Sequence, residues 1–286
     1  LDKKKQVVIT GSNASLLSKD LGTRLTGRHL RFELFPFSFK EFLELNQEKP
    51  GIKAFEKYFI QGGFPEYLKN QKIEILQELL NDIIARDIVA RYALRNAKTI
   101  KEMAVYLLTN TGKEFSFNAL KKTFGLGSIN TVIAFISYLE DSYLLFTIPK
   151  FDYSLKKQLI NQKKVYSIDN GLSNANSVSF SQDIGRMLEN IVFLNLRKKY
   201  KQVFYFKEKK ECDFLVKEKD KITIAIQACY ELTEENKERE ISGLIEALEE
   251  FKLNEGLIIT YNQADEIKTN NKKIFIKPAW KWLLEK

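Results

Sequence analysis

Glu189 is the acidic residue whose position in the sequence most clearly predicts chemistry. It lies on a helix predicted over residues 183–200 and shares one helix face with three apolar residues, Val192, Phe193 and Leu196. A carboxylate buried among apolar side chains is costly unless it is paired with a cationic group or bound to a cation. The sequence therefore predicts a partner for Glu189 in the folded protein.

A second polar group that could do chemistry is the amide of Asn13. It ends a turn that follows the apolar run at residues 7–9, and leucines at helical spacing follow it. This pattern predicts a buried parallel strand, a turn and a helix that stops at Gly27. Ligands bind at the carboxyl ends of strands in open α/β sheets, so Asn13 could orient a water or a phosphate there. Asn13 could equally be the N-cap of the helix, and the residues alone leave both interpretations open.

The elements that position these side chains predict a mixed α/β fold. The chain has 286 residues, of which 44% are hydrophobic, which is enough for two or three packed cores. No apolar run approaches the roughly 18 residues of a membrane span, so we expect a cytoplasmic protein without a membrane partner. Two cysteines form no disulfide framework. The single histidine, His29, excludes a His-rich zinc site and argues against a Ser-His-Asp triad.

The net charge of +9 is unevenly distributed. Residues 1–95 carry 16 basic and 12 acidic side chains, residues 96–164 carry 10 and 5, and residues 165–286 carry 20 and 20. An excess of basic groups favours a polyanionic partner, although a soluble surface explains a modest excess equally well. Any affinity for DNA should therefore lie in the first two thirds of the chain and fall with salt.

Residues 10–43, TGSNASLLSKDLGTRLTGRHLRFELFPFSFKEFL, resemble part of an AAA-type ATPase. The similar group is bacterial and archaeal and carries a C-terminal nuclease-like domain, domain of unknown function 4143. The resemblance implies that Asn13 senses the γ-phosphate of ATP. It also implies that Arg28, and less directly Arg24, completes the site of a neighbouring subunit in a homo-oligomer, where an arginine stabilises charge on the transferred phosphoryl group.

The chain departs from this family pattern in one important respect. No G-x-x-x-x-G-K-[ST] motif occurs in it, and the glycine-rich run at residues 125–128 lacks the lysine that a phosphate-binding loop requires. We therefore expect a fragment that begins inside the ATPase core, at residues 1–38, with a further strand over residues 29–39. This chain alone should not hydrolyse ATP.

Two modules are expected next. Residues 39–96 are helical by period, are interrupted by GGFPE at 62–66, and correspond to the helical lid of the resembled ATPases. Residues 97–164 predict a winged-helix domain with helices at 100–108, 116–124 and 128–140 and a strand at 143–149. Its third helix carries no arginine or lysine, whereas Lys121 and Lys122 lie on the second. These two lysines are the candidate DNA contacts, with packing against protein as the alternative.

Residues 165–286 predict a last domain, introduced by a polar linker or loop that follows a short strand at 165–168. Asp169 in this stretch is a possible ligand, although an Asp-Asn-Gly turn also explains it. After the helix that carries Glu189, strands are expected at 203–207, 212–217 and 222–228. Asp213 lies at the start of the second strand and Gln227 near the end of the third.

Glu189, Asp213 and Gln227 resemble in order and spacing the metal site of the PD-(D/E)xK nuclease fold. The resemblance implies three oxygen ligands for Mg²⁺. Gln227 replaces a glutamate, and Cys229 stands where such nucleases have a lysine, which Lys209 or Lys210 could supply from a nearby loop. The resembled domains often read Gln-x-x-Tyr here, matching Gln227 and Tyr230.

We therefore expect a nucleotide-dependent switch that acts on DNA or on a protein complex, with ATP as cofactor. Its nuclease-like domain is expected to act as a scaffold or binding module. The alternative is a metal-dependent DNA nuclease regulated by the ATPase.

Overall fold

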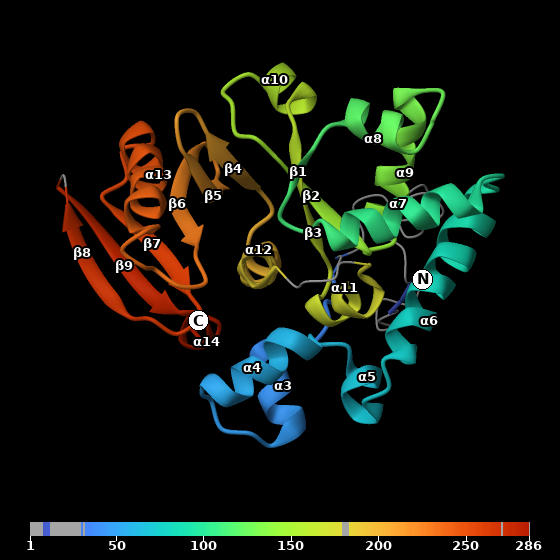
Figure 1. The fold of residues 1–286 in the computed structure, drawn as a ribbon, viewed down its shortest axis with the longest axis horizontal. Helices are drawn as coiled ribbons and strands as arrows, with labels where there is room; N and C mark the ends of the chain where they lie inside the picture. The colour runs from blue at the N-terminus through green and yellow to red at the C-terminus, as the bar shows by residue number, and fades with distance from the viewer. Residues whose placement is uncertain (1–7, 12–29, 31, 179–182, 270, 286) are drawn as a thin grey trace, which may run out of the picture.

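The computed structural model describes residues 8–11, 30, 32–178, 183–269 and 271–285. These residues form a mixed α/β fold with two sheets, one of three strands and one of six (Figure 1), which confirms the fold class expected from the sequence. Among the described residues, none of the helices combines the length and the hydrophobicity that a membrane crossing requires.

The first half of the described chain is mainly helical and contains one small sheet. Its elements are α3 (Phe39–Asn46), α4 (Ile52–Gln61), α5 (Pro65–Asn70), α6 (Glu74–Asp82), the π-helical η1 (Ile83–Ala90), α7 (Ala97–Thr109), β1 (Glu114–Phe115), α8 (Phe117–Thr123), α9 (Ile129–Asp141), β2 (Leu145–Pro149), α10 (Leu155–Ile160), β3 (Lys163–Ser167) and α11 (Asn170–Asn176).

The second half contains the larger sheet. Its elements are α12 (Ile184–Lys199), β4 (Val203–Lys207), β5 (Glu211–Glu218), β6 (Lys221–Ala228), α13 (Lys237–Glu250), β7 (Glu255–Thr260), β8 (Asp265–Thr269), β9 (Lys272–Pro278) and α14 (Ala279–Trp282). The strand expected at 203–207 is confirmed with the same bounds.

The smaller sheet has the strand order β1-β3-β2, and both of its pairings are antiparallel. The larger sheet has the order β4-β5-β6-β7-β9-β8. Strands β4, β5 and β6 pair antiparallel, whereas β6, β7 and β9 run parallel, and α13 makes the crossover from β6 to β7. A parallel pair requires such a crossover, and a helix is its usual form.

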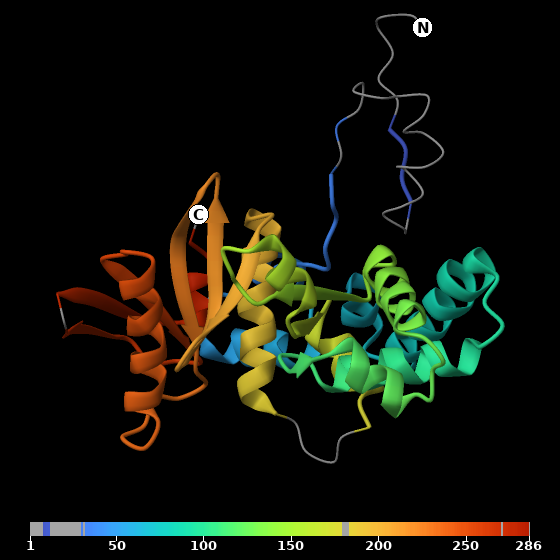
Figure 2. The ribbon, with the colours of Figure 1, turned by 90° about the horizontal axis from the view of Figure 1, so that it is seen from above.

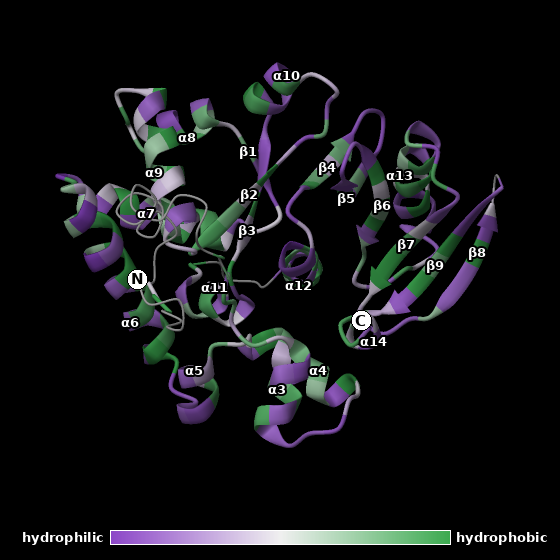
Figure 3. Ribbon diagram, turned by 180° about the vertical axis from the view of Figure 1, so that it is seen from behind, coloured by the Kyte–Doolittle hydropathy of each residue, from purple (hydrophilic) through white to green (hydrophobic). Residues whose placement is uncertain are grey.

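The two sheets meet beside α12, which lies between them both in the view of Figure 1 and in the view from above (Figure 2). The backbone N–H of Phe151, just after β2, donates to the carbonyl of Tyr205 on β4 at 2.7 Å. Buried side chains of α12 such as Phe193 pack in a core that extends from Phe39 to Trp282. Figure 3 shows hydrophobic and hydrophilic residues alternating around α6 and α12, as amphipathic helices require.

The strand expected over residues 29–39 is wrong for the residues that the structure describes. Residue 30 and residues 32–38 belong to no strand, and Leu30, Phe32 and Leu34 are each more than 80% exposed. Residues 8–11, at the end of the first expected strand, also lie outside any strand. An extended segment becomes a strand only when another strand accepts its hydrogen bonds, and the described residues provide none beside these segments.

Residues 32–38, which we call the strap, instead lie against α12 and β2 as an extended segment. The Glu33 carboxylate pairs with Arg197 at 2.9 Å, and the ring of Phe35 stacks on Phe146 with centroids 6.0 Å apart. The backbone N–H of Phe37 donates to the carbonyl of Gly63 at 2.8 Å. Asn13, Arg24 and Arg28, which carry the expected ATPase roles, lie outside the described residues.

The polar loop expected after residue 168 is replaced by the helix α11. Asp169 caps it, because one carboxylate oxygen accepts the N–H of Leu172 at 2.9 Å. The polar side chains of Asn170 and Asn176 donate to the carbonyls of Phe59 and Leu76, on α4 and α6. These asparagines therefore make interhelical hydrogen bonds, which composition alone does not distinguish from the solvation of a loop.

Candidate functional site

Five side chains from three elements meet at the junction of the two sheets, and we call them the Lys164 cluster. They are Lys164 and Tyr166 from β3, Glu189 from α12, and Glu211 and Asp213 from β5. Successive side chains of a strand point to opposite faces, so residues two apart share a face. This alternation places Lys164 beside Tyr166, and Glu211 beside Asp213.

The ammonium of Lys164 lies at the centre of the cluster. Its Nζ is 2.9 Å from Glu189 Oε1, 2.9 Å from Asp213 Oδ1 and 2.7 Å from Glu211 Oε1. A lysine ammonium has three N–H donors, and here each has a carboxylate acceptor. Lys164 is only 3% exposed. The partner that the sequence predicts for Glu189 is therefore a buried lysine of the same chain.

Aromatic packing holds Glu189 in place. The hydroxyl of Tyr166 donates to Glu189 Oε1 at 2.6 Å. The Tyr166 ring stacks on Phe193, one helical turn after Glu189, with ring centroids 4.3 Å apart. Because Phe193 and Glu189 share a helix face, one packed ring fixes both the helix and the carboxylate.

Burial and mutual charge set the protonation of the cluster. Burial by itself lowers the pKa of Lys164, but the carboxylates of Asp213, Glu189 and Glu211 raise it well above its usual range. Burial raises the pKa of Glu189, an effect that Asp213 reinforces and Lys164 opposes. Since three carboxylates surround its ammonium, Lys164 stays charged, and Glu189 is more easily protonated than an ordinary glutamate.

Asp213 and Gln227 are joined through the backbone of β5 and β6. Asp213 Oδ2 accepts the N–H of Ala228 at 3.0 Å, and Gln227 Oε1 accepts the N–H of Asp213 at 3.1 Å. The Gln227 amide donates to Glu240 Oε2 at 2.7 Å. The three residues expected at the site are thus brought together. Glu189 and Asp213 contact the Lys164 ammonium, and Gln227 contacts the backbone N–H of Asp213.

This arrangement does not fit a bound Mg²⁺. The carboxylate oxygens that would face the ion hold the ammonium of Lys164, and the Gln227 oxygen is engaged by backbone. Within the described part of the chain, no group of three or more His, Cys, Asp or Glu side chains has a geometry suited to a metal ion. The expected metal role of Glu189, Asp213 and Gln227 stays a prediction.

Cys229 and Tyr230 follow directly after β6. Burial raises the pKa of the Cys229 thiol to about 11, so it is protonated at neutral pH, and its sulfur donates to the carbonyl of Glu231 at 3.2 Å. Tyr230 stacks on Tyr261 with centroids 4.7 Å apart and lies 6.4 Å from the ring of Phe59 on α4. These contacts give Tyr230 a packing role between the larger sheet and the helices.

Within the described residues, the other lysines singled out from the sequence make no ion pair with the carboxylates of the Lys164 cluster. Lys121 and Lys122 are in the last turn of α8. The backbone N–H groups of Lys209 and Lys210 donate to the carboxylate of Glu246, both at 2.9 Å. The ammonium that faces Asp213 therefore comes from Lys164, in the preceding module.

Lys164 and Glu211 were missed from the sequence. The available signal was strand alternation, because KKVYS puts Lys164 and Tyr166 on one face and ECD puts Glu211 and Asp213 on another. That β3 faces β5 across α12 cannot be read from either segment. Asp169, the other acid considered, accepts the N–H of Gly63 at 2.6 Å besides capping α11.

Comparisons with known proteins place the chain among ATPase-associated proteins. Three family profiles match it: an AAA domain at residues 1–43, a domain of unknown function (DUF8612) at 52–183 and another (DUF4143) at 184–282. The AAA match indicates nucleotide binding in the family. No solved structure matches the chain.

Two curated relatives are similar over most of the chain. Uncharacterized protein MJ1544 of Methanocaldococcus jannaschii is 40% identical, and the match covers 97% of this chain and 68% of the relative. An uncharacterized protein of Haemophilus influenzae is 30% identical, and the match covers 81% of this chain and 61% of the relative. The chain therefore belongs to the same protein family as MJ1544, and its AAA-type segment marks it as an ATPase-associated protein.

Proposed function

We propose that this chain is the part of a AAA-type, ATP-dependent switch protein that holds a nuclease-like domain as a scaffold or binding module. The observation that carries the proposal is the Lys164 ammonium. It lies within 2.9 Å of Glu189 and Asp213, the two acids that resemble metal ligands of PD-(D/E)xK nucleases. A lysine from the chain itself thus provides the positive charge that a metal ion would provide.

The position of Lys164 also links the modules mechanically. Lys164 is on β3 of the smaller sheet, whereas Asp213 is on β5 of the larger one. A buried ion pair is costly to open, because separating the partners leaves uncompensated charges. The nuclease-like domain would therefore move as one body with the preceding module when the ATPase changes state.

The preceding module supports a winged-helix assignment. Its elements follow the order α7, β1, α8, α9, β2, α10, β3, and β3 pairs between β1 and β2. Such modules bind DNA or protein, so the proposed target is DNA or a protein complex. A neighbouring ATPase subunit is a further proposed partner, and the two free cysteines are consistent with a cytoplasmic location.

The proposal is tested by divalent-ion binding and DNA cleavage with the purified chain. Calorimetric titration with Mn²⁺ and Mg²⁺ should give no binding at the cluster. Single-stranded, duplex and branched DNA should stay intact with either ion, because the carboxylates already hold Lys164. Cleavage by the unmodified chain that Asp213→Asn abolishes would support the alternative, a metal-dependent nuclease regulated by the ATPase.

Lys164→Met is the informative variant, and Lys157→Met is its matched control. The Lys157 side chain is 64% exposed and pairs with Asp152, so its loss removes a lysine that is not part of the Lys164 cluster. We expect Mn²⁺ binding to appear in Lys164→Met and not in Lys157→Met. Mn²⁺ binding of equal strength to all three proteins would contradict the proposal.

A further inference from the structure

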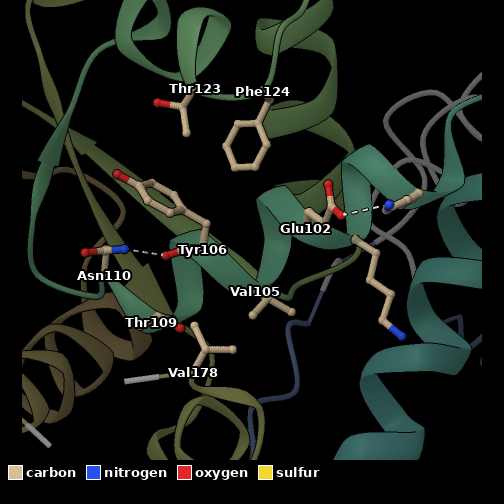
Figure 4. Close-up of a pocket in the computed structure, with 10 residues that line it drawn as sticks. Glu102, Val105, Tyr106, Thr109, Asn110, Thr123, Phe124 and Val178 are labelled. Atoms are coloured by element: carbon tan, nitrogen blue, oxygen red, sulfur yellow. Dashed lines mark hydrogen bonds and ion pairs between the residues drawn. The ribbon is translucent and has the colours of Figure 1, made fainter. Parts of the chain in front are cut away.

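A pocket on the outer face of α7 and α8 lies outside the Lys164 cluster. Its volume is about 670 Å³, within the range of about 300–1,000 Å³ that is typical of ligand pockets. Figure 4 shows the side chains that form it, with Val105, Tyr106 and Thr109 on α7, Phe124 directly after α8, and Val178 opposite. The expected ATPase and nuclease roles do not involve this pocket.

The walls of the pocket are apolar and aromatic. The rings of Tyr106 and Phe124 meet edge to face, with centroids 5.6 Å apart and planes at 83°. Tyr106 is 41% exposed and Val178 is 72% exposed, so much of this apolar surface faces solvent. Covering such surface with an apolar group of a partner is favourable.

The rim of the pocket is basic. Lys98 and Lys101 line it, and Lys121 and Lys122 lie in the last turn of α8, just before the Phe124 wall. Among the described residues that line the pocket, Glu102 is the one acid, and its carboxylate lies 3.8 Å from the Lys98 ammonium in an exposed pair. The charge that remains is positive, which favours an acidic ligand.

We propose that this pocket binds an acidic peptide segment of a partner protein, which inserts one bulky apolar side chain between Tyr106 and Val178. The concave apolar floor suits a side chain, whereas phosphates of duplex DNA need cations on an accessible surface. Helix α9, which would enter a DNA groove, presents the exposed side chains of Ile129 and Ile133 and carries no arginine or lysine. Acidic flanks of the peptide would meet Lys98, Lys101 and the lysines of α8.

The test is fluorescence anisotropy with the full chain and a fluorescein-labelled peptide in which a single tryptophan is flanked by aspartates. We expect saturable binding that weakens with salt. A peptide with alanine in place of tryptophan, and one with lysines in place of the aspartates, should each lose about tenfold or more in affinity.

Two variants and their matched controls locate the site. Tyr106→Ala and the double variant Lys98→Glu/Lys101→Glu should each weaken binding about tenfold. Tyr153→Ala and Lys156→Glu/Lys157→Glu change the same residue types near α10 and should leave affinity unchanged, since Tyr153 is 78% exposed and outside the pocket. Circular dichroism confirms that each variant is folded.

Three results would overturn the proposal. One is no binding of the tryptophan peptide, and another is binding that Tyr106→Ala and the charge reversal leave unchanged. The third is tight binding of duplex DNA that displaces the peptide, depends on Lys98 and Lys101, and is indifferent to Tyr106→Ala. That result would assign the surface to nucleic acid instead.

Discussion

The Nζ atom of Lys164 lies 2.9 Å from Asp213 Oδ1, although 49 residues separate them and each belongs to a different sheet. The contact is buried, so water screens it little. It therefore both neutralises an acidic site and ties the smaller sheet to the larger one.

Replacing Lys164 with methionine should destabilise the protein by about 3–5 kcal/mol, because it leaves the buried carboxylates of Glu189 and Asp213 without a cation. Glu211 keeps its pair with Lys207 at 3.1 Å. Urea denaturation measures the change. Addition of Mn²⁺ should restore part of the lost stability, since an ion that binds only the folded state stabilises it. An equal effect of Mn²⁺ on the unmodified protein would show that the lysine does not occupy a cation position.

Asp169 should make stability depend on pH between about 4 and 6. Burial raises the pKa of its carboxyl from 3.8 to about 6, although the N–H groups of Gly63 and Leu172 oppose the shift. A folded-state pKa above the unfolded value means that the folded protein binds the proton more strongly. Proton binding by Asp169 therefore adds up to about 3 kcal/mol to the free energy of unfolding. This stabilisation is fully present below pH 4 and is lost as the pH rises through 6.

Asp169→Asn tests this relationship. The amide keeps one acceptor oxygen but presents N–H donors where the second carboxylate oxygen accepted a backbone N–H, so it should cost about 1–3 kcal/mol at neutral pH. Between pH 4 and pH 7, the difference in the free energy of unfolding between the variant and the unmodified protein should become smaller as the pH rises. A gap that stays constant over this range would mean that Asp169 does not titrate there.

Gly63→Ala should destabilise the protein by about 3 kcal/mol or more. A Cβ at this position would lie 2.2 Å from the backbone oxygen of Phe37, and backbone cannot move aside as a side-chain tip can. Gly127→Ala is the matched control, because a Cβ there has no atom within 4 Å. Thermal unfolding should separate the two variants clearly, and similar melting temperatures would contradict the close approach of the strap to Gly63.

Arg197→Ala should release the strap without unfolding the core. Arg197 pairs with Glu33 at 2.9 Å, and its guanidinium lies 5.9 Å from the ring centroid of Phe35 and 5.4 Å from that of Phe146. We expect the free energy of unfolding to fall by about 1–2 kcal/mol and amide hydrogen exchange at residues 33–37 to become faster. The control Arg86→Ala removes a pair with Asp82 on an exposed helix surface and should change neither.

The sequence by itself determined the mixed α/β class and most elements of residues 39–286. Helical spacing was sufficient for α9, whose buried residues Val132, Phe135, Ile136 and Leu139 share one face. A short apolar run was sufficient for β4, which is buried on both faces. It also determined that Glu189 needs a partner, since an acid on an apolar helix face is costly alone.

Only the tertiary structure decided which group that partner is. Lys164 reaches Glu189 because β3 and β5 approach α12 from its two sides, and contacts of such sequence separation leave no local pattern. The same reason explains α11, whose asparagine-rich sequence is also typical of a loop. Its asparagines Asn170 and Asn176 donate hydrogen bonds to carbonyls of α4 and α6, which are distant in the sequence. Composition shows which hydrogen bonds the polar groups of a segment could make locally. Tertiary packing decides which distant groups form hydrogen bonds with them.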